Sequence, residues 1–208
     1  MSSGSAGSLT TLVLEKIAGI LLSDYEGLFR RAYEDAVQVL EGARPLEPAD
    51  EIRNAFDHFS IALLWAYRAE GPEVMTSIKL KQDADPKLEA LVNLEQARRH
   101  LTIGRLHCIE HQIEALIKLI HSHGRSLAPP ERPSFASVFE EADRLQDKYR
   151  ETRIIVLDQM SDLRQIEQNI KDVDGKTEQL TRIAVEFLGL AKKFQKTTSV
   201  DSGKAKAE

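Results

Sequence analysis

The stretch ADEIRNAFDHFSIALLW, residues 49–65, contains the side chains best suited to chemistry: Arg53, Asn54 and His58. In a helix, at about 100° per residue, its apolar and polar side chains fall on opposite sides. The apolar side comprises Ile52, Phe56, Phe59, Leu63 and Ala66, and the polar side comprises Asp50, Arg53, Asn54, Asp57 and His58. Histidine transfers protons near neutral pH, and arginine binds phosphate oxygens. The polar side is therefore a candidate site for phosphate chemistry. The alternative is a solvated face on which Arg53–Asp57 and Asn54–His58 pair locally.

The letters RNAFDH, residues 53–58, resemble the motif of the HEPN superfamily, in which a histidine follows an arginine by a few residues. A polar residue commonly comes directly after that arginine, and Asn54 fits. The resemblance implies an all-α fold, and many family members are ribonucleases of toxin–antitoxin, CRISPR and phage-defence systems. It also implies that Arg53, Asn54 and His58 are catalytic. His58 would move a proton, Arg53 would balance the phosphorane charge, and Asn54 would orient either. A second match, Arg105 to His111, lacks the polar residue.

Arg53 and His58 lie about 140° apart around a helix, so one helix does not easily bring both to one phosphate. In the HEPN family this is commonly resolved by a dimer that places two motifs across one cleft. The resemblance therefore implies a homodimer as well as an RNA substrate. A cognate partner protein is a further possibility that toxin–antitoxin membership implies.

A second polar stripe is predicted on the helix that follows. Its members are His100, Gly104, His107, His111, Glu114 and Lys118, which lie within about 80° of one another. HCIEH, residues 107–111, spells the His-x-x-Glu-His of one metalloprotease group, and His107 and His111 could share a zinc ion with Glu114. The motif is short and no acidic motif follows it downstream. We therefore predict no metal site and no cofactor.

The same helix is locally cationic. Arg98, Arg99 and Arg105, together with His107, face few acidic residues between positions 98 and 125. Clustered positive charge attracts the phosphates of nucleic acid. These four residues are therefore the predicted RNA-binding residues, facing the helix of residues 49–65 across a groove.

Composition sets limits on the class of protein. The chain has 208 residues, 42% hydrophobic and 29% charged, with a net charge of −5, which argues against whole-surface attraction to nucleic acid or anionic membranes. The single cysteine, Cys108, excludes an internal disulfide. The start lacks the basic region of a secretory signal, and the apolar run of residues 9–22 falls short of the ~20 residues of a membrane span. We expect a cytoplasmic protein without membrane contact.

Helix signals divide the chain into segments. Helices are predicted over residues 8–41, 48–69 and 86–123, ended by Gly42 with Pro45, by Gly71-Pro72 and by the proline-rich GRSLAPPERPS. Residues 1–8 and 197–208 are predicted to be disordered tails. A helical bundle domain is expected over residues 9–128, and a coiled-coil helix or hairpin over residues 129–196.

Residues 135–194 carry a heptad pattern. One position comprises Phe135, Ala142, Tyr149, Val156, Leu163, Ile170, Thr177, Ala184 and Ala191; the other comprises Val138, Leu145, Thr152, Gln159, Ile166, Val173, Leu180, Phe187 and Phe194. Such a seam pairs with another helix. The segment should therefore hold a dimer together or fold back, with the turn expected at Asp174-Gly175. An ordinary bundle helix is the alternative.

These observations predict an all-α, antiparallel helical bundle similar to HEPN proteins, with a long C-terminal coiled-coil helix or hairpin. The expected function is metal-independent cleavage of RNA in bacterial defence or a toxin–antitoxin system. The alternatives are a non-enzymatic coiled-coil scaffold or an inactive HEPN-like binding module.

Overall fold

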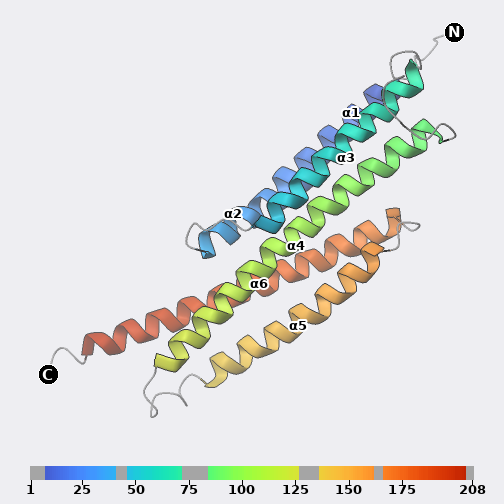
Figure 1. Cartoon of the computed structure of the whole chain (residues 1–208). Helices are drawn as coiled ribbons and strands as arrows, with labels where there is room; N and C mark the ends of the chain where they lie inside the picture. Colours follow the sequence, from blue (N-terminus) through green and yellow to red (C-terminus); the bar gives the residue numbers. More distant parts are fainter. Residues whose placement is uncertain (1–7, 41–45, 72–83, 127–135, 162–165, 205–208) are drawn as a thin grey trace, which may run out of the picture. The chain divides into compact units, whose positions relative to one another are not determined.

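The computed structural model describes residues 8–40, 46–71, 84–126, 136–161 and 166–204, and everything in these ranges that is regular is helical (Figure 1). The helices are α1 (Leu9–Ile20), the π-helix η1 (Leu21–Phe29), α2 (Arg30–Val39), α3 (Leu46–Glu70), α4 (Pro86–Ser126), α5 (Ala136–Ser161) and α6 (Ile166–Lys204). The all-α prediction is therefore confirmed. None of the described helices has an apolar stretch long enough to cross a membrane.

The chain forms two compact units. The first unit comprises Met1–Glu34 and Pro45–His107, and the second comprises Asp35–Arg44 and Cys108–Glu208. The division therefore falls within α4, whereas the sequence pattern placed a domain boundary near residue 128. α6 also continues to Lys204, beyond residue 196, where a disordered tail was expected to begin.

In the first unit, α1 and α3 run antiparallel and pack against each other. Ser8 accepts a hydrogen bond from the Thr11 amide and begins α1 as its N-cap. Glu70, at the end of α3, accepts hydrogen bonds from the amide and hydroxyl of Thr10 at 2.8 and 2.9 Å. A carboxylate placed at a helix N-terminus satisfies donors that the helix leaves open. The end of α3 thus fixes the start of α1.

The buried face of α3 differs from the predicted one. Ala55, Phe59, Ala62 and Ala66 are buried, but Phe56, predicted to be on the apolar side, is 44% exposed. α3 also contacts α4, through Glu51 and through His58, which the helical wheel assigned to the polar side. The core of the unit adds Val13, Ile17, Ile20, Phe29, Trp65, Ala90, Leu94, Ala97 and Leu101.

In the second unit, α5 and α6 form an antiparallel hairpin (Figure 1). The predicted heptad register is confirmed at most of the seam positions whose side chains are described: Val138 is half-buried, and the others are buried, namely Ala142, Leu145, Tyr149, Thr152, Ala184, Phe187 and Ala191. The predicted turn is wrong. Gly175 lies inside α6, and α5 already ends at Ser161.

Where its side chains are described, the hairpin covers its own seam within one chain. Ring stacking of Phe139 on His121 and the 3.5 Å ion pair between Arg153 and Glu110 join α5 to the last part of α4. The buried seam positions therefore need no second copy to shield them from water. A dimer held by residues 135–194 was expected because the heptad seam needs a partner helix, and in the hairpin α5 and α6 are partners of each other.

Candidate functional site

One histidine of α3, His58, and one of α4, His100, each form a hydrogen bond to a side chain of the other helix. Glu51 and His58 are two turns apart on α3, and Asn93 and His100 are two turns apart on α4, so each pair shares one helix face. Because the helices are antiparallel, Glu51 meets His100 and His58 meets Asn93. The Glu51 Oε2 to His100 Nδ1 distance is 2.6 Å, and the His58 Nδ1 to Asn93 Oδ1 distance is 2.8 Å.

The two imidazole rings stack on each other. Their centroids are 5.2 Å apart and their planes differ by 18°. Asn93 is buried, His58 is half-buried, and the side chain of His100 is 23% exposed. We call His58 and His100 the histidine pair. The pair is therefore partly shielded and partly open to water.

Gly104 allows the close packing on which this arrangement depends. A Cβ atom at Gly104 would lie 2.6 Å from the Phe29 ring and 3.1 Å from the Cβ of Glu51. Real Cβ atoms do not approach a ring carbon that closely. A glycine one turn after His100 therefore lets α4 lie against η1 and α3, and this places Glu51 beside His100.

The predicted catalytic residues are only partly brought together. His58 contacts α4, whereas Arg53 points to solvent with a side chain that is 70% exposed and forms an ion pair with Asp50 at 3.1 Å. Asn54, half-buried, lies one turn before His58. Within one chain, Arg53 does not reach the histidine pair, as expected from the ~140° between them.

The predicted RNA-binding residues have different surroundings. Arg98 forms a 3.3 Å ion pair with the buried Asp24 of η1, and Arg105 is only 8% exposed. Arg99 and His107 are half-buried. Binding of RNA by these residues stays a prediction. The burial of Arg105 and the pairing of Arg98 count against those two members.

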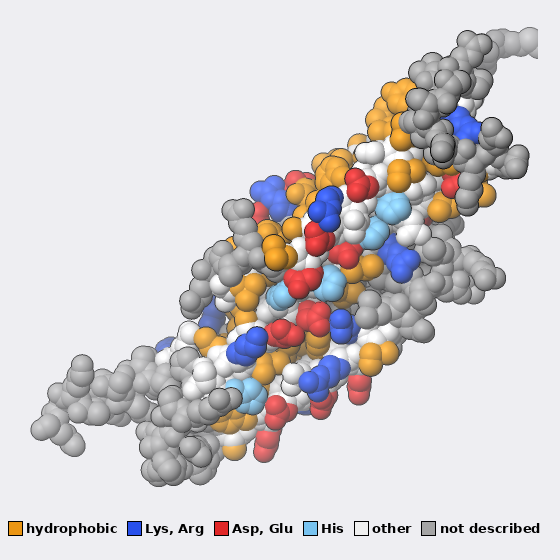
Figure 2. Space-filling view, viewed as in Figure 1, with side chains coloured by type: hydrophobic (Ala, Val, Ile, Leu, Met, Phe, Trp, Pro, Cys, Tyr) orange, Lys and Arg blue, Asp and Glu red, His pale blue; other side chains and the backbone are white. Residues whose placement is uncertain are grey.

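The surface is not uniformly basic. In the space-filling view, histidine side chains appear among intermixed acidic and basic side chains (Figure 2). The described part of the chain brings together no group of three histidine, cysteine or carboxylate side chains that could hold a metal ion. His107 and His111 each take part in another interaction.

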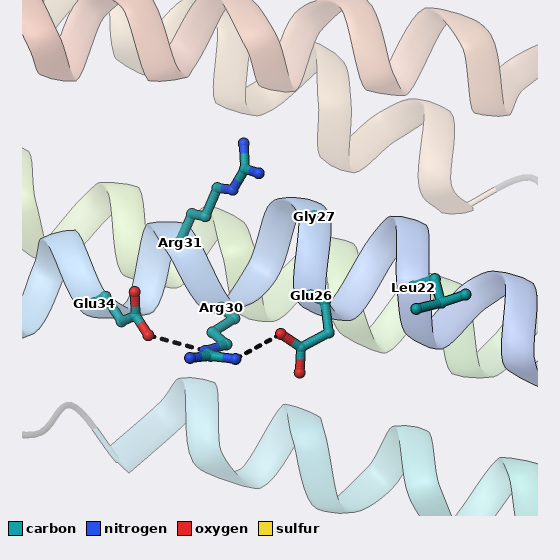
Figure 3. Close-up of a pocket in the computed structure, with 6 residues that line it drawn as sticks. All are labelled: Leu22, Glu26, Gly27, Arg30, Arg31 and Glu34. Carbon is teal, nitrogen blue, oxygen red and sulfur yellow. Dashed lines mark hydrogen bonds and ion pairs between the residues drawn. The ribbon is translucent and has the colours of Figure 1, made fainter.

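Two further features do not involve the histidine pair. A shallow pocket of about 380 Å³ is lined by residues of η1 and α2, namely Leu22, Glu26, Gly27, Arg30, Arg31 and Glu34 (Figure 3). Glu26 and Glu34 hold Arg30 at 2.7 and 2.9 Å and raise its pKa, so its charge is already balanced.

Cys108 is buried, and burial raises the pKa of its thiol to about 12. Such a thiol is not a nucleophile near neutral pH.

Comparison of the chain with protein-family models, curated proteins and solved structures gives no match.

Sequence reasoning missed Glu51 and Asn93 and did not connect His100 with His58. A signal was present: E-x6-H from Glu51 to His58 and N-x6-H from Asn93 to His100 are two turns long on helices predicted to be neighbours. The two spacings predict the hydrogen bonds only when the register between α3 and α4 is known, and Gly104 helps to set that register.

Proposed function

We propose that the histidine pair is an acid–base site and that the protein is a HEPN-like, metal-independent endoribonuclease of a bacterial defence or toxin–antitoxin system. One observation carries the proposal. Both Nδ1 atoms are held by hydrogen bonds, while neither Nε2 has a hydrogen bond to the described residues. Two stacked imidazoles therefore each keep a second nitrogen that is not bonded to the described residues.

Cleavage of RNA requires two proton transfers. The 2′-hydroxyl loses a proton as its oxygen attacks the neighbouring phosphorus, and the 5′-oxygen gains a proton as its bond to phosphorus breaks. Histidine is suited to both transfers near neutral pH. The two rings, with centroids 5.2 Å apart, lie close enough for one ring to accept a proton and the other to donate one. That combination is what an acid–base pair needs.

The phosphate also needs a cation. Arg99 directly precedes His100 on α4 and is half-buried. It is therefore the nearest candidate in sequence within the chain. Arg53 remains part of the proposed site if a second copy supplies it, as in the dimeric arrangement of the HEPN family. Asn54 keeps its proposed orienting role, because it lies one turn from His58.

The experiment uses the full chain and single-stranded RNA in the presence of EDTA. The expected result is cleavage that leaves a 2′,3′-cyclic phosphate and a 5′-hydroxyl. An oligonucleotide with 2′-deoxyribose at the cleaved position is the matched control and should resist cleavage there. Absence of cleavage, or cleavage that EDTA abolishes, would contradict the proposal.

A second candidate is a non-enzymatic interaction protein. It is favoured by large apolar side chains left exposed in the first unit, including Leu14 at 49%, Leu22 at 72% and Leu46 at 77%. Leu14, Ala18 and Leu22 recur every four residues and are all exposed, so they form one stripe along α1 into η1. Exposed apolar patches often mark association surfaces. We propose that this stripe, rather than the hairpin seam, joins two copies of the chain.

A further inference from the structure

We infer that Asn93 and Glu51 are positioning residues that give the two histidines different roles, His58 as general base and His100 as general acid, each acting through Nε2. The roles rest on the proposed function. The proton positions rest on the hydrogen bonds alone.

The amide of Asn93 fixes the proton on His58. Its Nδ2 donates to the backbone carbonyl of Glu89 at 2.8 Å, and a carbonyl oxygen can only accept. Oδ1 of Asn93 therefore faces His58, and because it too can only accept, the Nδ1 of His58 must carry the proton. In the neutral ring the lone pair is then on Nε2, and this nitrogen can accept a proton.

The carboxylate of Glu51 fixes His100 in a related way. A carboxylate only accepts, so the Nδ1 of His100 donates to it. When the ring is protonated this contact is also an ion pair. Asn93 offers His58 no charge of this kind. The contact of His100 is thus the only one of the two that becomes an ion pair on protonation, and a protonated His100 carries a proton on Nε2 that it can donate.

The reaction balances on these two nitrogens. Nε2 of His58 accepts the proton of the 2′-hydroxyl while its oxygen forms a bond to phosphorus. The bond from phosphorus to the 5′-oxygen breaks, and that oxygen takes the proton from Nε2 of His100. The products are the cyclic phosphate and the 5′-hydroxyl. His58 ends protonated and His100 neutral, and exchange with water restores the starting state.

The proton positions can be read without any assay of activity. We expect nitrogen-15 spectra of the wild-type chain at a pH where His58 is neutral to show its proton on Nδ1 and its lone pair on Nε2. Asn93→Leu removes the acceptor and should move the proton to Nε2, the form that a free histidine side chain prefers. Gln96→Leu is the control, because Gln96 is an amide on α4 with no hydrogen bond to the described residues.

Cleavage provides the second readout. Asn93→Leu should lower cleavage by roughly ten- to a hundredfold, the loss that follows removal of the orienting partner of a metal-bound histidine. Glu51→Gln still accepts from Nδ1 of His100 but removes the charge, so cleavage should fall while the proton stays on Nδ1.

A wild-type spectrum with the His58 proton on Nε2 would overturn the inference, and so would an Asn93→Leu chain with unchanged proton positions. The test on the wild-type chain does not depend on whether any variant folds. Absence of cleavage in a chain that shows the expected spectrum would refute the proposed ribonuclease and leave the assignment of the protons supported.

Discussion

Gly104 is the residue on which the packing around the histidine pair depends most directly. Gly104→Ala would place a methyl group 2.6 Å from the Phe29 ring. We expect the free energy of unfolding to fall by about 1–3 kcal/mol, as for other overpacked sites. Because Glu51 Cβ is the next neighbour at 3.1 Å, the contact of Glu51 with His100 should also loosen. Urea unfolding measures the first effect, and nitrogen-15 spectra of His100 measure the second.

Gly19 provides the matched control. It is an exposed helical glycine with nothing within 4 Å of an added Cβ. Gly19→Ala should raise the free energy of unfolding by about 0.5–1 kcal/mol, because alanine loses less backbone entropy in a helix. Equal effects of the two substitutions would contradict the close packing described at Gly104.

Glu70 predicts a dependence of stability on pH. Hydrogen bonds, first from the Thr10 amide and then from the Thr10 hydroxyl, hold its pKa below the ordinary carboxyl value. A carboxylate with a lowered folded-state pKa stabilises the fold above its unfolded pKa. That stability is lost as the pH falls through the folded-state pKa. The wild type should therefore melt at a higher temperature than Glu70→Gln at neutral pH, and the difference should disappear in acid.

Scanning calorimetry across the acid range would measure this difference. Glu15→Gln, which neutralises an exposed carboxylate of α1, is the control and should change the melting curve little. A constant difference between the wild type and Glu70→Gln at every pH would show that the charge of Glu70 does not stabilise the start of α1.

At the scale of elements, the hairpin of α5 and α6 should tolerate changes on one face only. Phe187 is fully buried, whereas Val185, two residues earlier on α6, is 60% exposed. Phe187→Ala should lower the free energy of unfolding by about 3–5 kcal/mol through lost burial and the cavity it leaves. Val185→Ala should change it by about 0.5 kcal/mol or less. Chemical denaturation followed by circular dichroism tests both, and similar losses would refute the register.

The helices were predictable to different degrees. Gly71-Pro72 and Pro86 mark the boundaries of α3 and α4 closely, because proline and glycine act through the local backbone. The turn of the hairpin was misplaced, because glycine inside a helix costs only about 1 kcal/mol and packing along the seam outweighs it at Gly175. The π-helical stretch Leu21–Phe29 had no local signal.

The site was less predictable than the fold. His58 was predicted as a site residue from the sequence of its own helix. Its contacts with Asn93 and His100 were not, because they depend on the register between α3 and α4. Arg53 illustrates the opposite error. Its position in a motif suggested joint action with His58, while helix geometry directs it to solvent and to Asp50. A motif in one helix identifies residue types, but tertiary packing decides which of them meet.

At the scale of the whole molecule, we expect two copies to associate through the stripe of Leu14, Ala18 and Leu22. Light scattering should give the mass of a dimer for the wild type and of a monomer for Leu14→Glu with Leu22→Glu, because charges on an apolar interface lose their hydration. Ile154→Glu, at a 68% exposed position of α5, should leave the dimer intact. A monomeric wild type at micromolar concentration would contradict this proposal.

The central claim is that the histidine pair performs chemistry, and its most direct test compares cleavage and stability in the same variants. His58→Asn and His100→Asn each remove Nε2 but keep a donor near the position of Nδ1. Asp57→Asn, on the exposed side of α3, is the control. We predict that cleavage of single-stranded RNA in EDTA falls about a hundredfold or more in either histidine variant, with unfolding nearly unchanged. Cleavage that persists in the double variant would contradict the claim. A wild type that cleaves no RNA, with histidine variants that only lose stability, would also contradict it.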